Sequence, residues 1–291
     1  MRFSITTPSF GQLAFLRLNA ASVADQRSPG VEVEHLVQDG GSRDGTAEWL
    51  ATRPDINGLV EPDDGMYDAI NRGIRRGSGD VHAWLNCDEQ YLPGALAAVA
   101  DHFLRHPEVD ILIGHTVVVD EEGRYLCHRK AVIPTPGILK RGRLPLHSSS
   151  LFFRRHLVHG PRGGLFDPAW KAMGDWAWIC AVLQQGARIE VHDAFLSTFT
   201  DTGGNLGMSP RAREEMSRVK AGLSPLDHLA TPIVRGVDYM RKALSGYYRQ
   251  RPFDYVIYRP DPSTPLGVSH ERRVFHVDRP TVIWKGHMLG T

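Results

Sequence analysis

The stretch DDGMYDAINRGIRRGSGDVHAWLNCDE, residues 63–89, carries the pattern that decides the fold of this 291-residue chain. Apolar residues recur at helical spacing in its first half and predict a helix: Met66, Ile70 and Ile74. A Gly-Ser-Gly break follows, and residues 81–86 have the composition of a strand. That strand runs directly into side chains that a sheet interior cannot bury without partners: Asn86, Cys87, Asp88 and Glu89.

The first half of the chain alternates between strand-like and helix-like periods, which is typical of βα units on a parallel sheet. From residue 108 onward the pattern contains more strands, including a hairpin turned at DEEG, residues 120–123. We therefore expect an α/β fold with a mostly parallel central sheet flanked by helices. Beyond residue 207 the composition predicts a C-terminal helical and hairpin extension.

The expected domain organisation is a core over residues 1–207 and an extension over residues 208–291. The core divides into a nucleotide-binding half, residues 1–107, and an acceptor half, residues 108–207.

Composition excludes several classes of protein. The formal net charge is +1, with 34 basic against 33 acidic residues, so no basic excess suggests a nucleic-acid partner. Three cysteines without a close pair argue against a disulfide framework and a cysteine-built zinc site. The N-terminus lacks the apolar run of a signal peptide, and no apolar stretch is long enough to span a membrane. We expect a cytoplasmic protein.

Four predicted strands end in polar residues, and ligands of open α/β sheets bind at these ends. The four ends are Thr7–Ser9, Gln38–Gly40, Glu61–Asp64 and Asn86–Glu89. Several acids around one crevice, on a nearly neutral protein, suit a divalent cation that in turn holds phosphates.

Two of these segments resemble known motifs. VQDGGSRDGT, residues 37–46, resembles the second-strand motif of the nucleotide-sugar glycosyltransferases of family 2, which have the GT-A fold. EPDDGMYDAINRGIRRGSGDVHAWLNCDE, residues 61–89, is similar to a non-processive subgroup pattern that ends in an Asn-x-Asp-Asp metal motif. The resemblance covers about residues 1–205. It implies an inverting, metal-dependent transfer of one sugar from a nucleoside-diphosphate sugar to an acceptor hydroxyl.

The resemblance also implies residue roles on the donor side. The expected nucleotide-binding residues are Thr7, Pro8, Ser9, Asp39, Asp64, Asn71, Asn86 and His147. Asp88 would bind Mg²⁺ or Mn²⁺, with Glu89 or water as the next ligand, because the usual paired aspartates are replaced here. His147, in a segment similar to the subgroup's His-Gln-x-x-x-Phe, could touch the diphosphate or the metal, although Ser148 replaces the Gln.

On the acceptor side, transfer with inversion requires a base that takes the proton of the acceptor hydroxyl. Asp175, at the start of a predicted helix, resembles the family's base. The Gln-x-x-Arg-Trp motif of processive synthases is missing from the sequence, which favours single addition. The basic loop residues Lys140, Arg141 and Arg143 either clamp phosphate or form a solvated cluster.

The extension allows two interpretations of each of its parts. The basic, aromatic-bearing segment 232–250 either lies on an anionic membrane surface, near a lipid-linked acceptor, or packs on the core as an ordinary helix. The hairpin predicted near the C-terminus either dimerises or closes over the site.

Other functions stay open at this point. A catalytically degenerate nucleotide- or carbohydrate-binding module is one alternative. A sugar nucleotidyltransferase is another, although TTPSFGQ, residues 6–12, lacks the basic glycine-rich loop of that class. A dehydrogenase is disfavoured because no Gly-x-Gly-x-x-Gly follows the first strand. The residues do not set the donor nucleotide (UDP, GDP or dTDP), the sugar, the acceptor or the oligomeric state.

Overall fold

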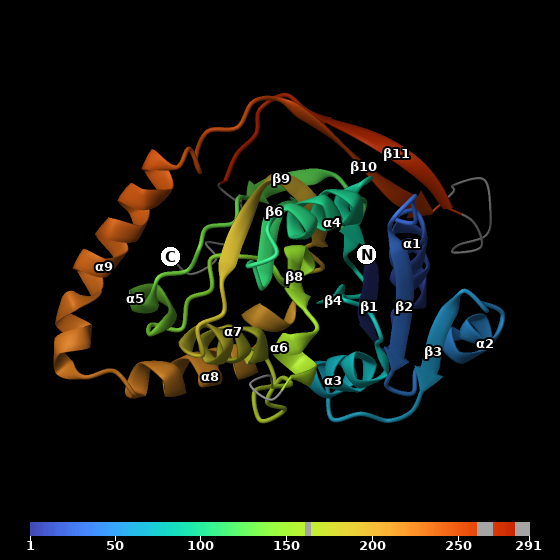
Figure 1. The fold of residues 1–291 in the computed structure, drawn as a ribbon, viewed down its shortest axis with the longest axis horizontal. Helices are drawn as coiled ribbons and strands as arrows, with labels where there is room; N and C mark the ends of the chain where they lie inside the picture. The colour runs from blue at the N-terminus through green and yellow to red at the C-terminus, as the bar shows by residue number, and fades with distance from the viewer. Residues whose placement is uncertain (161–163, 261–269, 283–291) are drawn as a thin grey trace.

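The fold is built on one large mixed sheet. A computed structural model describes residues 1–160, 164–260 and 270–282, and within them nine strands form this sheet (Figure 1). In order across it they are β3 (Ile56–Val60), β2 (Glu32–Asp39), β1 (Arg2–Ser9), β4 (Val81–Trp84), β8 (Leu151–Arg154), β6 (Ile111–Val119), β9 (Ile189–Thr200) and β5 (Gln90–Tyr91), with β7 (Tyr125–Arg129) paired to β6.

Parallel pairing is concentrated in the N-terminal half. The strands β3, β2, β1 and β4 pair in parallel, as the βα alternation predicts. The strand β8 then pairs antiparallel with both β4 and β6, and β9 returns parallel to β6. The α/β prediction is confirmed, and every antiparallel pair of this sheet involves at least one strand beyond residue 107.

Helices cover both faces of the sheet. They are α1 (Leu13–Ala24), α2 (Thr46–Ala51), α3 (Met66–Arg76), α4 (Ala95–Arg105), α5 (Pro136–Leu139), α6 (His156–His159), α7 (Gly174–Gln184), α8 (Pro210–Ala221) and α9 (Pro225–Leu244). Short 3₁₀ turns lie at Ser148–Ser150 and Leu206–Met208.

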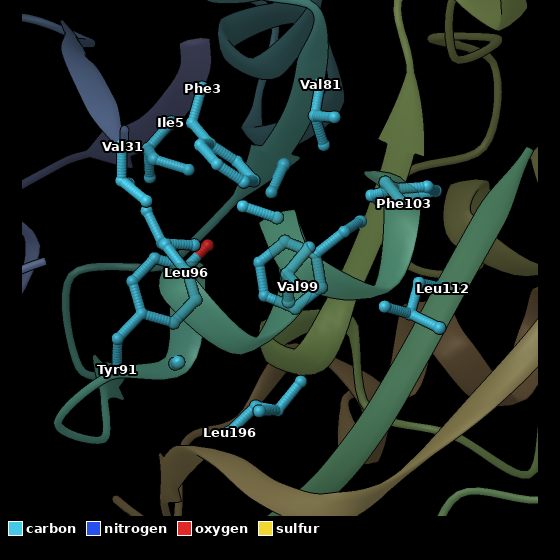
Figure 2. Packing of buried hydrophobic residues seen from close by; sticks show 14 of the residues in the cluster. Phe3, Ile5, Val31, Val81, Tyr91, Leu96, Val99, Phe103, Leu112 and Leu196 are labelled. Carbon is cyan, nitrogen blue, oxygen red and sulfur yellow. The ribbon is translucent and has the colours of Figure 1, made fainter. Parts of the chain in front are cut away.

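The alternation of side chains along the strands divides the core in two, because successive residues of a strand face opposite sides. In β8, Phe152 packs with α4 on one face, whereas Leu151 and Phe153 pack with α3 and α7 on the other. Figure 2 shows the first cluster, in which Leu96 and Val99 of α4 lie among side chains of the sheet.

The hairpin of the extension packs against the core. Its strands β10 (Phe253–Pro260) and β11 (His270–Val277) bury Tyr255 with the end of β6. The side-chain amide of Gln90 exchanges two hydrogen bonds with the backbone of Tyr258, at 2.8 and 3.0 Å. The hairpin therefore supports the short strand that directly follows Glu89.

The long helix α9 lies at the outer end of the molecule, beside α5 and away from β3 and α2 (Figure 1). It begins with a capping box at Ser224 and Asp227, and it has no buried residue. In the described residues, no helix combines the length and apolarity needed to cross a membrane.

Several histidines are buried, and burial lowers their pKa values. His35, whose Nε2 lies 2.9 Å from the Thr7 hydroxyl, has a pKa lowered to about 3 by burial, and the pKa of His82 is lowered to about 4 for the same reason. The unfolded chain protonates these rings near pH 6.5 and the folded chain does not. Stability is therefore present above that pH and is lost as the pH falls towards the folded values.

We predict that His35→Gln makes unfolding less sensitive to acid. Between pH 7.5 and 4.5, the free energy of unfolding should fall by about 2 to 3 kcal/mol less in this variant than in the parent. Urea titrations at both pH values measure this difference. Replacement of the exposed His228 by Gln is the control, and an unchanged pH dependence of His35→Gln would show that His35 is not the responsible group.

Candidate functional site

The carboxyl ends of the parallel strands meet at one edge of the sheet. Ser9 at the end of β1 is paired with Asp39 at the end of β2, and the Gly40 N–H donates to the Ser9 carbonyl at 2.9 Å. The Leu85 N–H donates to the Thr6 carbonyl at 2.9 Å, which brings the end of β4 alongside β1. The polar segments identified in the sequence therefore lie together.

Asp39 organises the loop after β2. Its carboxylate accepts hydrogen bonds from the Gly41 and Ser42 N–H groups, at 3.0 and 2.8 Å, and from the Ser42 hydroxyl, at 2.6 Å. Asp39 is fully buried. In this structure the Asp39 carboxylate binds only groups of its own loop. It therefore fixes the conformation of that loop, which borders the site.

The carboxylate of Asp63, in the acidic run after β3, approaches the loop after β2. A Cβ on Gly40 would come within 2.9 Å of the Asp63 carboxylate, so glycine is what permits the approach. Burial raises the pKa of Asp63, and the charges of Asp68 and Asp39 raise it further. Asp64, expected from the sequence, is exposed, and its carbonyl accepts a hydrogen bond from Lys171 at 2.8 Å. The sequence contained the signal for Asp63 in the same acidic run.

A side chain of α1 holds the loop after β4. The Asn19 side-chain amide donates to the Asn86 and Glu89 carbonyls, at 2.9 and 3.1 Å. The Asn86 N–H donates to the Glu89 carboxyl at 2.8 Å, and the Thr200 hydroxyl donates to the Asp88 carbonyl. This turn fixes the Asp88 backbone and leaves its carboxylate partly exposed.

The same loop is poor in positive charge and in donors. Desolvation raises the pKa of Asp88 to about 6, and burial together with the Asp88 charge raises that of Glu89 well above its usual range. Among the described residues, Asn86 Oδ1 and Glu89 Oε1 are buried without a hydrogen-bond partner. A divalent cation held by Asp88 fits this oxygen-rich set, whereas Glu89 is fully buried.

Asp175 is connected to the end of β4 through aromatic packing: Tyr67, which donates to it, and Trp84 of β4 have ring centroids 5.7 and 4.9 Å from that of Phe166. Its negative charge also contributes, after burial and the charge of Asp88, to the raised pKa of Glu89. Desolvation raises the pKa of Asp175 itself. A raised pKa is a property that carboxylates acting as general bases share.

The helix α3 positions Asp175 through Tyr67. The Tyr67 hydroxyl donates to the Asp175 carboxylate at 3.2 Å, and this hydrogen bond opposes the rise of the Asp175 pKa. A Cβ on Gly174 would come within 2.8 Å of the Tyr67 ring, so glycine at this position allows the contact.

Asn71, one turn further along α3, has a structural role. Its amide donates to the Phe166 carbonyl at 2.7 Å and accepts from the Phe166 N–H at 2.9 Å. Asn71 is buried, and both polar atoms of its side chain are used. In this structure Asn71 fixes the segment that leads to Asp175, and its contact with the nucleotide stays a prediction.

The side chain of Thr7 is also engaged within the protein, and its contact with the nucleotide stays a prediction. Its hydroxyl lies 3.3 Å from Asn19 Oδ1 and 2.9 Å from His35 Nε2, inside the layer between the sheet and α1. Pro8 and Ser9 continue β1 to the edge, so these two expected residues do lie at the strand ends.

His147 lies beside the last residues of β9. Its ring centroid is 4.8 Å from that of Phe199, next to the Thr200 that holds the Asp88 carbonyl. Burial lowers the pKa of His147 to about 4, so the imidazole is neutral at physiological pH. A neutral imidazole can accept a hydrogen bond or ligate a metal.

Two of the three basic loop residues are used to hold α9. Lys140 pairs with Asp227 at 2.7 Å, and Arg141 donates to Thr231 and to the Asp227 carbonyl. These contacts answer the question left by the sequence for Lys140 and Arg141: both are docking residues of the extension.

The residue that the sequence analysis missed most clearly is Glu215 of α8. Its fully buried carboxylate accepts the N–H groups of residues 171, 172 and 173, at 2.7, 3.0 and 2.9 Å. Those residues lead directly into Asp175. Nothing in the local pattern around Glu215 signals this role, because its partners are distant in sequence.

A second group that could hold a metal lies elsewhere. One ligand atom each from His102, His106 and Glu190 falls within 4.8 Å of the others. Glu190 is at the start of β9 and Asp88 contacts its end, so roughly 30 Å of strand separates the two places. This group is therefore distinct from the strand-end acids.

We predict that Glu215→Ala destabilises the fold and the loop before Asp175. It leaves three N–H groups without their acceptor, so the free energy of unfolding should fall by about 3 kcal/mol. Thermal and urea unfolding measure the loss, and hydrogen exchange should increase at residues 171–173. Glu214→Ala, at the exposed neighbour, is the control. Equal stability of the two variants would refute a structural role for Glu215.

Comparison with known proteins identifies the family of this chain. The model of glycosyl transferase family 2 matches residues 4–164, more than half of the chain. Two proteins from strains of Mycobacterium tuberculosis, both described as uncharacterized glycosyltransferases, are 39% identical over 90 residues. That match covers 30% of this chain and 34% of the relatives, so the chain matches about a third of their length.

Solved structures show the same fold. TarS of S. aureus, residues 1–349, in complex with UDP-GlcNAc superposes with a TM-score of 0.58 at 19% identity, over 75% of this chain and 64% of that one. The mannosyltransferase PcManGT of Pyrobaculum calidifontis, in complex with GDP-Man and Mn²⁺, gives 0.54 at 18% identity, over 82% and 69%. The strand-end motifs, the family match and the shared fold together establish that this chain belongs to glycosyl transferase family 2 and has a GT-A glycosyltransferase fold.

Proposed function

We propose that this protein transfers a single sugar, with inversion, from a nucleoside-diphosphate sugar to an acceptor hydroxyl. The observation that carries the proposal is the packing that joins the end of β4 to Asp175: Trp84, just before the Asn86–Glu89 loop, and Tyr67, which donates to Asp175, both contact the ring of Phe166. We infer that a donor-side acid and an acceptor-side acid from distant parts of the sequence line one site. Structural neighbours bound to UDP-GlcNAc or GDP-Man support the nature of the donor.

In this proposal, the nucleotide lies against Pro8 and Ser9, with Asp39 and Asp63 at the wall and Asp64 at the rim. Asp88 holds Mg²⁺ or Mn²⁺, Asn86 and Glu89 support the loop behind it, and His147 faces the diphosphate. The cation stabilises the negative charge that develops on the departing nucleoside diphosphate. The protein residues exclude water and set the direction in which the donor presents its sugar.

On the acceptor side, Asp175 takes the proton of the attacking hydroxyl. The Tyr67 hydrogen bond orients its carboxylate, and desolvation raises its pKa, which strengthens it as a base. We propose that the acceptor is a sugar or lipid-linked hydroxyl in polysaccharide or glycolipid assembly. We also propose that the protein works in the cytoplasm, with peripheral contact at the inner membrane surface.

The first test is calorimetric titration with UDP, GDP and dTDP, with and without Mn²⁺. One of the diphosphates should bind more tightly with Mn²⁺, and Asp88→Asn should remove most of that gain. Asp175→Asn should keep metal-dependent binding and lose turnover. A folded protein that binds none of the nucleotides under any condition would contradict the proposal. Retained transfer by Asp175→Asn would contradict the role of the base.

The second test concerns pH. The base must be ionised, so turnover should rise as the pH rises through the pKa of Asp175. Tyr67→Phe removes a hydrogen bond that lowers this pKa, so the acidic limb of the profile should move to higher pH. Hydrolysis of the donor sugar by water, followed without acceptor, provides the profile. Tyr239→Phe, on α9, is the control. An unshifted profile of Tyr67→Phe would show that Tyr67 does not set the pKa of the base.

A further inference from the structure

The helix α9 presents its apolar residues to the outside. Leu226, Leu229, Ile233, Val237, Met240 and Leu244 recur at spacings of three and four, which places them on one face of a helix. Their exposed fractions run from 52% to 82%. We call these six residues the outer face of α9. A soluble surface rarely exposes so many large apolar side chains in one continuous stripe.

The opposite side of the helix, which contacts the core, is largely polar. Asp227 pairs with Lys140 at 2.7 Å, and Thr231 accepts a hydrogen bond from Arg141 at 3.0 Å. Val234 lies close to Gly137 of α5. The helix thus contacts the core through its hydrophilic side. Its apolar side faces away from the core.

The charges of α9 are arranged by sign. Its two acids, Asp227 and Asp238, are turned inward and paired, the second with Lys242 at 2.8 Å. The basic residues Arg235, Arg249 and Arg251 are exposed on the helix or just after it. Residues 208–251 hold nine basic residues against four acids. The region therefore offers apolar and positively charged groups together.

These features favour an anionic bilayer over a second copy of the chain. Two α9 helices would bring like charges together, and Pro232 and Gly236 interrupt the middle of the helix that such a pair would need to match. A lipid surface can bury an apolar stripe without a matching partner helix. Its anionic headgroups attract the basic residues beside that stripe. Tyr239 and Tyr248, 64% and 40% exposed, suit the headgroup level.

We propose that the outer face of α9 inserts into the interfacial layer of a membrane that carries anionic lipids. This deepens the proposed function, on which its consequence rests, because α9 is connected to the acceptor side. It packs on α5, whose Leu139 carbonyl accepts a hydrogen bond from the indole of Trp176, the neighbour of Asp175. Membrane binding would hold the base near hydroxyl groups carried by lipid-linked acceptors.

The test is sedimentation of the full chain with vesicles. Two compositions are compared, phosphatidylcholine alone and an equal mixture of phosphatidylcholine and phosphatidylglycerol. The parent protein should sediment with the mixed vesicles, and raised salt should weaken that binding. Leu229→Gln/Ile233→Gln/Met240→Gln should bind at least about tenfold more weakly, as should Arg235→Glu/Arg249→Glu.

Leu104→Gln, at a 69% exposed residue of α4, is the matched control and should bind like the parent. Circular dichroism and thermal unfolding of every variant show that the fold is intact, and nucleotide binding is measured separately, so a failure of membrane binding is distinguishable from a failure of the proposed function. Absent sedimentation of the parent, or equal binding by the triple variant, would overturn the proposal. A dimer in analytical ultracentrifugation that the triple variant dissociates, without vesicle binding, would assign the face to a second copy.

Discussion

The structure depends on the collection of acidic side chains at one edge of the sheet, where the protein supplies few donors to satisfy them. Asp39 is satisfied by its own loop, but Asp63, Asp88, Glu89 and Asp175 all have pKa values raised mainly by burial. Such an arrangement costs stability in the free protein. A bound cation with its phosphate-bearing ligand would relieve that cost. The buried acids therefore give the site a physical reason to bind a cation.

The acceptor side depends on a different constraint, because Asp175 sits at the start of a helix whose preceding loop has little structure of its own. Two helices hold that loop: α3 through Tyr67 and Asn71, and α8 through Glu215. The position of Asp175 is therefore set by residues on both sides of it in sequence. The extension contributes to the candidate site by fixing the backbone that leads to Asp175.

The sequence predicted the βα units and the strand ends well, since both follow from short-range periodicity. The strand expected to end at Glu61–Asp64 is β3, and the polar ends of β1, β2 and β4 meet as expected. Roles that depend on distant partners were not predictable: Asn71 is bonded to Phe166, and Thr7 to His35. The orientation of α9 was also not predictable, because periodicity identifies an apolar face but does not determine whether that face is buried or exposed.

The most direct test of this account is a crystal structure with Mn²⁺ and the nucleoside diphosphate that binds, with anomalous scattering used to locate the metal. We predict a Mn²⁺ peak within about 2.2 Å of an Asp88 carboxylate oxygen, bridging to the diphosphate. Asp175 should face the site from the opposite side. A peak at His102, His106 and Glu190 instead, or a diphosphate bound away from the ends of β1, β2 and β4, would contradict the account.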